Sequence, residues 1–103
     1  MERKIKFVCN AVKWFDKVNG NTYHSVQITR CKDGKVLYCP YTYGYGDHYR
    51  QTALEAMALN EWLPSGYQTG SNLWGYEREN NYPIEWIVSH GPKRECIANG
   101  KEV

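Results

Sequence analysis

The fold is decided by residues 17–43, KVNGNTYHSVQITRCKDGKVLYCPYTY, because two turn signals divide this stretch into strand-like runs. The dipeptides are Asn-Gly at 19–20 and Asp-Gly at 33–34, which are typical of tight β-hairpin turns. The runs around them alternate in polarity and are rich in β-branched and aromatic residues, as strands are. The pattern predicts strands over 22–30 and 36–43, joined by a hairpin.

Residues 3–14 extend this pattern upstream. Ile5, Phe7, Cys9 and Ala11 alternate with Lys4, Lys6, Val8 and Asn10, which predicts a strand with one buried face. The first 43 residues therefore form a three-stranded antiparallel meander. In the third strand, Pro40 lacks a backbone N–H, so we expect this strand to be an edge strand or to carry a bulge.

A helix is predicted from about His48 to Leu59. Tyr49, Ala53, Ala56 and Met57 follow the spacing of a buried helical face. We expect Asp47 to cap the start of this helix and Asn60 to end it.

Residues 64–83 read as a long loop that holds a short helix over 71–79. A strand over 84–88 and a short helix over 93–98, started by Pro92, complete the chain. The expected fold is a single α+β domain over residues 1–103. It has two layers, an antiparallel sheet made of the N-terminal meander and a later strand, packed by one main helix.

Composition excludes several classes of protein. The 103 residues include no apolar run near the roughly 20 residues that a membrane helix needs. The N-terminus shows no signal-peptide pattern, so we expect a cytoplasmic protein with no membrane partner. The four cysteines, at 9, 31, 39 and 96, lack metal-ligand spacing, so we expect free thiols and neither a metal nor a cofactor.

The densest candidate site lies in residues 41–50, YTYGYGDHYR. Its glycines allow close approach of a ligand, and the start of the helix offers free N–H groups. Tyr41, Tyr43 and Tyr45 share one parity and are expected to form a row. An ordinary turn with a helix cap is the alternative for this segment. The predicted binding residues are Tyr43, Tyr45, Asp47, His48, Tyr49 and Arg50, with Trp14 and His24 as neighbours.

Two other functions stay open. Residues 1–35 carry eight Lys or Arg against three acids, so the basic strands can bind nucleic acid. The cations expected on phosphates are Lys4, Lys6, Lys13, Arg30, Lys32 and Lys35. A small hydrolase or nuclease that uses His48 and His24 as acid and base is the third hypothesis.

Three segments, 14–26, 44–53 and 80–86, resemble those of small proteins that bacteriophages and prophages carry and for which no activity is established. The resemblance covers most of the chain and implies an accessory factor that binds a host protein, such as an inhibitor of CRISPR or another defence system. It assigns no role to any residue. With 9 Tyr and 4 Trp and no catalytic signature, the first hypothesis is a non-enzymatic protein that docks on a host macromolecule. We expect it to be a monomer or a dimer joined at a sheet edge.

Overall fold

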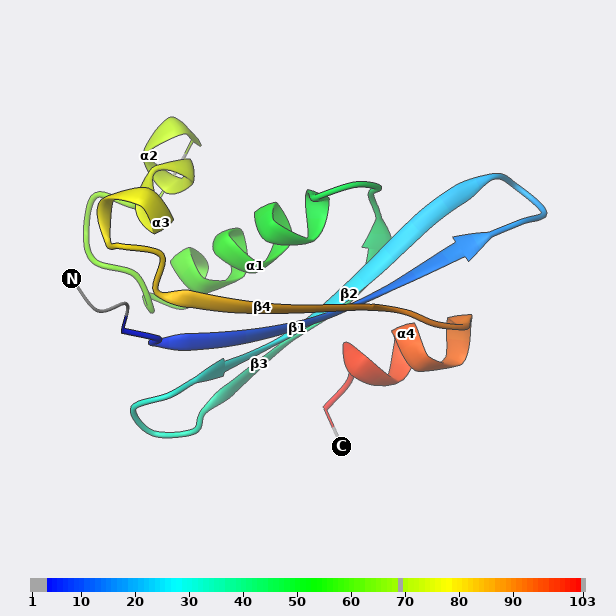
Figure 1. The fold of residues 1–103 in the computed structure, drawn as a ribbon, viewed down its shortest axis with the longest axis horizontal. Coiled ribbons are helices and arrows are strands. Elements are labelled where there is room, and N and C mark those ends of the chain that lie inside the picture. The colour runs from blue at the N-terminus through cyan, green and yellow to red at the C-terminus, as the bar shows by residue number, and fades with distance from the viewer. Residues whose placement is uncertain (1–3, 69, 103) are drawn as a thin grey trace.

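The computed structural model describes residues 4–68 and 70–102 and shows helices arranged around a four-stranded sheet (Figure 1). Its elements are β1 (Phe7–Asp16), β2 (Asn21–Arg30), β3 (Val36–Tyr43), α1 (His48–Leu59), α2 (Gly70–Trp74), α3 (Tyr76–Glu79), β4 (Ile84–His90) and α4 (Lys93–Asn99). The strand order is β3-β2-β1-β4. The α+β class and the antiparallel meander β1-β2-β3 are confirmed.

β4 is the one parallel member of this mostly antiparallel sheet, and it pairs with β1. The direction follows from the connection, because α1 to α3 carry the chain back to the end where β1 begins. There the backbone N–H groups of Lys6 and Phe7 donate to the carbonyl oxygen of Pro83, at 2.7 and 3.2 Å. Both strands therefore start from a shared anchor.

The main core lies between α1 and one face of the sheet. Alternation along β1 and β2 places the apolar side chains on this face, as the sequence predicts. α1 turns its apolar stripe toward them. The buried residues of these three elements include Phe7, Cys9, Ala11, Val26, Ile28, Tyr49, Ala53, Leu54 and Met57.

α4 covers part of the opposite face and adds to the expected two layers (Figure 1). The Asn99 side-chain amide donates to the carbonyl oxygen of Asn10 at 3.0 Å and to the Ser25 hydroxyl at 3.2 Å. Gly100 packs so closely that a Cβ would collide with the carbonyl oxygen of Cys39. These contacts explain why Ser25 is buried although it points away from α1.

The prediction for Pro40 is confirmed. β3 is an edge strand, and its register against β2 shifts between His24 and Val26, opposite Pro40. At this shift Pro40 has no partner residue in β2, so its missing N–H leaves no carbonyl group of β2 without a ladder hydrogen bond.

The prediction that Asp47 caps α1 is wrong. The helix begins at His48 as expected, but the Asp47 side chain makes no capping hydrogen bond. Its backbone has φ −90° and ψ 13°, outside the extended region from which an N-cap side chain reaches the first turn. The carbonyl oxygen of Asp47 instead accepts from the N–H of Arg50 at 2.9 Å.

The loop after α1 contains two short helices, α2 and α3, where one helix over 71–79 was expected. Gly75 separates the two helices. No helix in the described ranges, 4–68 and 70–102, combines the length and apolar character that crossing a membrane requires.

The end of α1 is a Schellman motif. Asn60 ends the helix as predicted, and Glu61 follows in the left-handed conformation with φ 59°. The N–H of Trp62 donates to the carbonyl oxygen of Met57 at 2.8 Å, and that of Glu61 donates to Ala58 at 3.1 Å. This reversal turns Trp62 back toward the sheet, where its ring stacks 6.0 Å from that of Phe7.

Glu61→Gly is therefore expected to raise the free energy of unfolding by about 1 kcal/mol, because glycine adopts the left-handed conformation without the Cβ penalty. Urea unfolding measures the change. The matched control is Glu55→Gly, in the exposed middle of α1, which we expect to lower stability by about 1 kcal/mol. Equal destabilisation by both variants would contradict this description of the helix end.

Candidate functional site

The structure separates the predicted binding residues onto the two faces of the sheet. Tyr43 ends β3 and points to the face away from α1, where it contacts Tyr23. His48 lies in the first turn of α1, on the other side. Tyr45 and Asp47 lie exposed in the turn between them. The segment 43–50 therefore does not form one continuous surface.

Four rings, from Trp14, Tyr23, Tyr41 and Tyr43, form a cluster that we call the aromatic surface. Trp14 and Tyr23 face each other across β1 and β2, and their rings stack at 5.1 Å. Tyr41 and Tyr43 meet Tyr23 edge-on at 5.7 and 6.0 Å. Tyr41 and Tyr43 remain 40% and 54% exposed. The cluster thus brings predicted residues Trp14 and Tyr43 together.

The expected row of tyrosines is only partly right. Tyr41 and Tyr43 share a face as predicted, but β3 ends at Tyr43, so Tyr45 lies beyond the alternating strand. Tyr23 extends the row instead, and the register of β2 with β3 places it there.

His24 is a buried, doubly bonded histidine. Its Nδ1 lies 3.1 Å from the carbonyl oxygen of Gly44, to which it must donate, and its Nε2 lies 2.7 Å from the Thr52 hydroxyl, from which it accepts. This is the neutral form of the ring. Burial is the main reason that the pKa of His24 lies below its usual value, and nearby His48 lowers it further.

The His24 and His48 rings lie side by side, with centroids 5.4 Å apart. His48 is exposed, whereas both nitrogens of His24 are occupied by Gly44 and Thr52. His24 therefore has no nitrogen free for proton transfer to a substrate. The two rings and Gly44 form a structural contact rather than an acid–base pair, and we call this contact the histidine bracket.

Gly44 is required by this bracket. A Cβ at Gly44 would lie 2.7 Å from the His48 ring and 2.8 Å from the His24 ring. The glycine that the sequence marked as an approach site for a ligand is thus approached by the protein's own side chains.

Tyr49 and Arg50 are engaged within the fold. Tyr49 is 8% exposed and meets the Trp86 ring edge-on at 5.5 Å. The Arg50 guanidinium lies 5.3 Å from the centre of the same ring and 3.9 Å from the Glu77 carboxylate. Trp86 Nε1 donates to Glu77 at 2.7 Å, which closes the network. These contacts explain both residues as supports between α1, α3 and β4.

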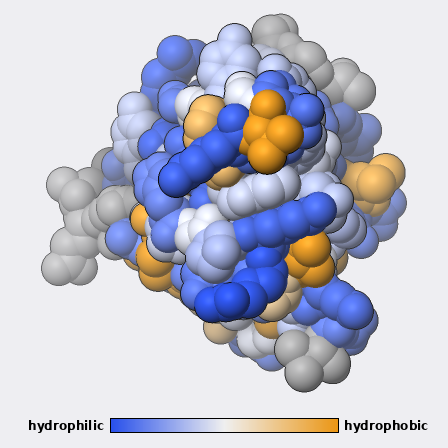
Figure 2. Space-filling model, turned by 90° about the vertical axis from the view of Figure 1, so that its right-hand side faces the viewer, coloured by the Kyte–Doolittle hydropathy of each residue, from blue (hydrophilic) through white to orange (hydrophobic). Residues whose placement is uncertain are grey.

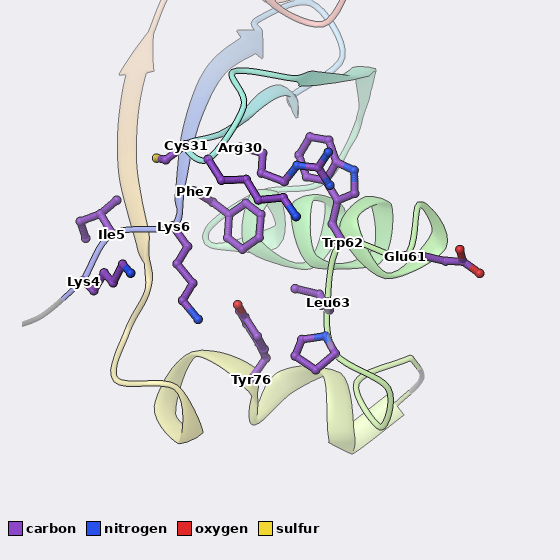
Figure 3. A pocket seen from close by; sticks show the side chains of 12 residues that line it. Lys4, Ile5, Lys6, Phe7, Arg30, Cys31, Glu61, Trp62, Leu63 and Tyr76 are labelled. Atoms are coloured by element: carbon purple, nitrogen blue, oxygen red, sulfur yellow. The ribbon is translucent and has the colours of Figure 1, made fainter.

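A second surface is a cavity of about 740 Å³ at the start of β1, which we call the basic cavity. Its lining includes the cations Lys4, Lys6, Arg30 and Lys32, together with Trp62 and Tyr76 (Figure 3). Four of the six cations proposed for phosphate contact from sequence meet here. The remaining two, Lys13 and Lys35, do not line it, and Lys13 lies over the Tyr49 ring at 5.2 Å.

Sequence reasoning missed Trp62 and Tyr76 as members of a site. Trp62 reaches the cavity only through the left-handed turn at Glu61, and Tyr76 only through the short helix α3. The one available signal is that a tryptophan two residues after a helix end packs onto the C-terminal turn in Schellman motifs.

The cysteines are free thiols, as predicted, and three of the four are buried. Burial raises the pKa of Cys39 to about 11 and also raises the pKa values of Cys9 and Cys96. Cys31 is exposed beside the basic cavity. In the described part of the chain, no three His, Cys, Asp or Glu side chains form a group that would hold a metal ion.

Comparisons of this chain with protein-family models, with curated protein sequences and with solved structures find no match.

We expect the protein to lose stability as the pH falls below about 6.5. The pKa of His24 is lower in the fold than in the unfolded chain, so the unfolded chain binds the proton more readily. Acidification therefore stabilises the unfolded state relative to the folded state. Urea unfolding between about pH 7.5 and pH 5 measures the effect, in a range above the titration of Asp33, whose pKa is held at about 2 by Arg30. His24→Gln should flatten the profile, and exposed His90→Gln should not; an unchanged profile in His24→Gln would contradict the assignment.

Alkylation of the native protein is expected to modify one thiol, that of Cys31. The thiolate is the reactive form, and burial disfavours it at the other three positions. Iodoacetamide treatment at about pH 8, followed by intact-mass analysis, should show one adduct, and four after denaturation. Cys31→Ser should leave the native protein unmodified; rapid labelling of a second thiol would show that the core opens.

Proposed function

We propose that this protein binds another protein through the aromatic surface and carries out no chemistry itself. The supporting observation is that Tyr41 and Tyr43 are half exposed while both rings contact Tyr23, which is itself stacked on Trp14. Tyr and Trp are enriched among residues that dominate binding energy at protein interfaces. Rings that are already ordered lose little conformational entropy on binding.

The setting of the aromatic surface favours a docking role. The β1–β2 hairpin reaches beyond α1 and α4 (Figure 1). Figure 2 views this end of the molecule and shows separate hydrophobic side chains among hydrophilic ones, without one continuous apolar face. Lys93 lies 5.3 Å from the centre of the Trp14 ring and places a cation at the rim. Aromatic centres with polar rims are typical of interfaces between proteins that also exist separately.

The class of partner follows from the resemblance to phage and prophage proteins. It points to a bacterial host protein, with components of CRISPR and other defence systems as the first targets to examine. An enzymatic role is less well supported, because the buried ring of His24 has both nitrogens in internal hydrogen bonds.

The test is capture of a partner by immobilised protein from a nuclease-treated bacterial lysate, with quantitative mass spectrometry. The double variant Tyr41→Ala/Tyr43→Ala is expected to weaken binding of the captured partner by about tenfold or more, the loss of about 1.4 kcal/mol or more that hot-spot rings produce. Both side chains are exposed, so the variant should remain folded by circular dichroism.

The matched control is Leu59→Ala, which removes an apolar side chain that is 85% exposed on α1. It should capture the same partner as the wild type. A partner retained equally by the tyrosine double variant would overturn the assignment to the aromatic surface.

A further inference from the structure

The basic cavity is assembled by backbone contacts that set its rim. The N–H of Cys31 donates to the carbonyl oxygen of Lys6 at 2.9 Å, and the N–H of Lys6 donates to that of Pro83 at 2.7 Å. These bonds hold the start of β1 against the turn that follows β2. Lys6 and Lys32 therefore line one cavity although they come from different segments.

The charges at the cavity are unbalanced. Arg30 is paired with Asp33 at 2.7 Å, and Glu61 is the one acidic residue among the described residues that line the cavity. In the described ranges, no ion pair engages Lys4, Lys6 or Lys32. Three lysines thus line the cavity, and the Glu61 side chain is directed away from it (Figure 3), which favours an anionic ligand.

The opposite wall is flat and aromatic. Figure 3 shows Lys4 and Lys6 on one side of the cavity and Arg30 with Trp62 on the other. The Arg30 guanidinium lies 4.6 Å from the centre of the Trp62 ring, and two hydrogen bonds to Asp33, at 3.1 and 2.7 Å, fix its orientation. Such planes of guanidinium and indole are the surfaces on which unpaired nucleobases stack.

The floor of the cavity adds a polar group. Tyr76 is 2% exposed, and its hydroxyl is directed into the cavity from α3, beside Leu63 (Figure 3). A hydroxyl in this position can donate a hydrogen bond to, or accept one from, a base or a sugar.

We propose that the basic cavity binds single-stranded nucleic acid, with a base against the Arg30–Trp62 wall and phosphates on Lys4, Lys6 and Lys32. The volume of about 740 Å³ lies within the range of sites for small molecules, about 300–1,000 Å³, so a nucleotide unit can enter. A further cation, Lys35, ends the same turn as Lys32, outside the lining. A strand that continues past the cavity would use this cation, whereas a single nucleotide would not. An acidic peptide matches the charges but makes no use of the flat wall.

The test is fluorescence anisotropy with a labelled single-stranded oligonucleotide of mixed sequence at low salt. Lys6→Gln/Lys32→Gln is expected to weaken binding about tenfold and to reduce the slope of log affinity against log salt by about 1.4, because two phosphate contacts are lost. The matched control, Lys17→Gln/Lys101→Gln, removes the same net charge from exposed lysines outside the cavity and should change affinity less than threefold, on the order of experimental scatter.

Three outcomes overturn the proposal. The first is no binding at low salt, and the second is an equal loss in the cavity variant and in the control, since binding would then follow net charge alone. The third is equal affinity for a duplex of the same sequence or for polyglutamate, since a paired base or a peptide cannot stack on the wall. A clear preference for the single strand supports the proposal.

A second measurement locates the site without changing its lysines. Bound oligonucleotide should slow alkylation of Cys31, which lines the cavity, and polyglutamate at the same concentration should not. Trp62→Ala should weaken binding about tenfold through lost stacking, with its fold checked by thermal unfolding. Unchanged Cys31 alkylation at saturating oligonucleotide would place binding elsewhere and overturn the assignment.

The proposals for the aromatic surface and for the basic cavity can be tested separately. Tyr41→Ala/Tyr43→Ala changes the aromatic surface and leaves the basic cavity intact, so it should bind the oligonucleotide like the wild type. Loss of oligonucleotide binding in this variant would contradict the cavity as the site.

Discussion

The pairing of β1 with β2 is the constraint on which the rest of this structure depends. Its register sets Ala11 opposite Val26 and Cys9 opposite Ile28, so that both strands turn the same apolar face toward α1. A slip by one residue would move every one of these side chains to the other face. The same register places Trp14 and Tyr23 on the far face, where Trp14 stacks on Tyr23 and Tyr23 contacts Tyr41 and Tyr43. Core and aromatic surface are thus two consequences of one alternation.

The parallel strand β4 has a different consequence. Because β4 must start beside β1, α1 carries the chain along one face of the sheet to the end where β1 begins, and the segment with α2 and α3 leads from there into β4. The C-terminal turn of α1 and the short helix α3 are thereby brought over Lys6 and Arg30. The basic cavity is the space left between this returning segment and the first strand. Its cations come from the strand ends, and its aromatic side chains come from the connection.

Close backbone approach also shapes the site region. Gly44 has no side chain, so the rings of His24 and His48 can pack against it, and the carbonyl group of Gly44 accepts a bond from His24. This bracket joins the end of β3, the centre of β2 and the first turn of α1. It draws His24 into the core and leaves Tyr45 and Asp47 in an exposed turn. A segment that reads as a single binding loop is therefore divided between structural support and free surface.

The sequence by itself determined the meander, the apolar faces of its first two strands, the helix from His48 to Leu59 and the edge or bulge at Pro40, because these depend on local turn chemistry and on the periods of side-chain burial. It also named Lys4, Lys6, Arg30 and Lys32 among six candidates for phosphate contact, and these four line one cavity. Only the tertiary structure decided that β4 is parallel, that α4 covers the second face, and that Trp62 and Tyr76 join those cations. These features arise from contacts between residues far apart in the chain, and a local sequence pattern does not predict which distant segments will pack together. The predicted Asp47 cap failed because the residue type favours a cap, whereas the backbone angles that Asp47 adopts in the folded chain, φ −90° and ψ 13°, are not those of a capping residue.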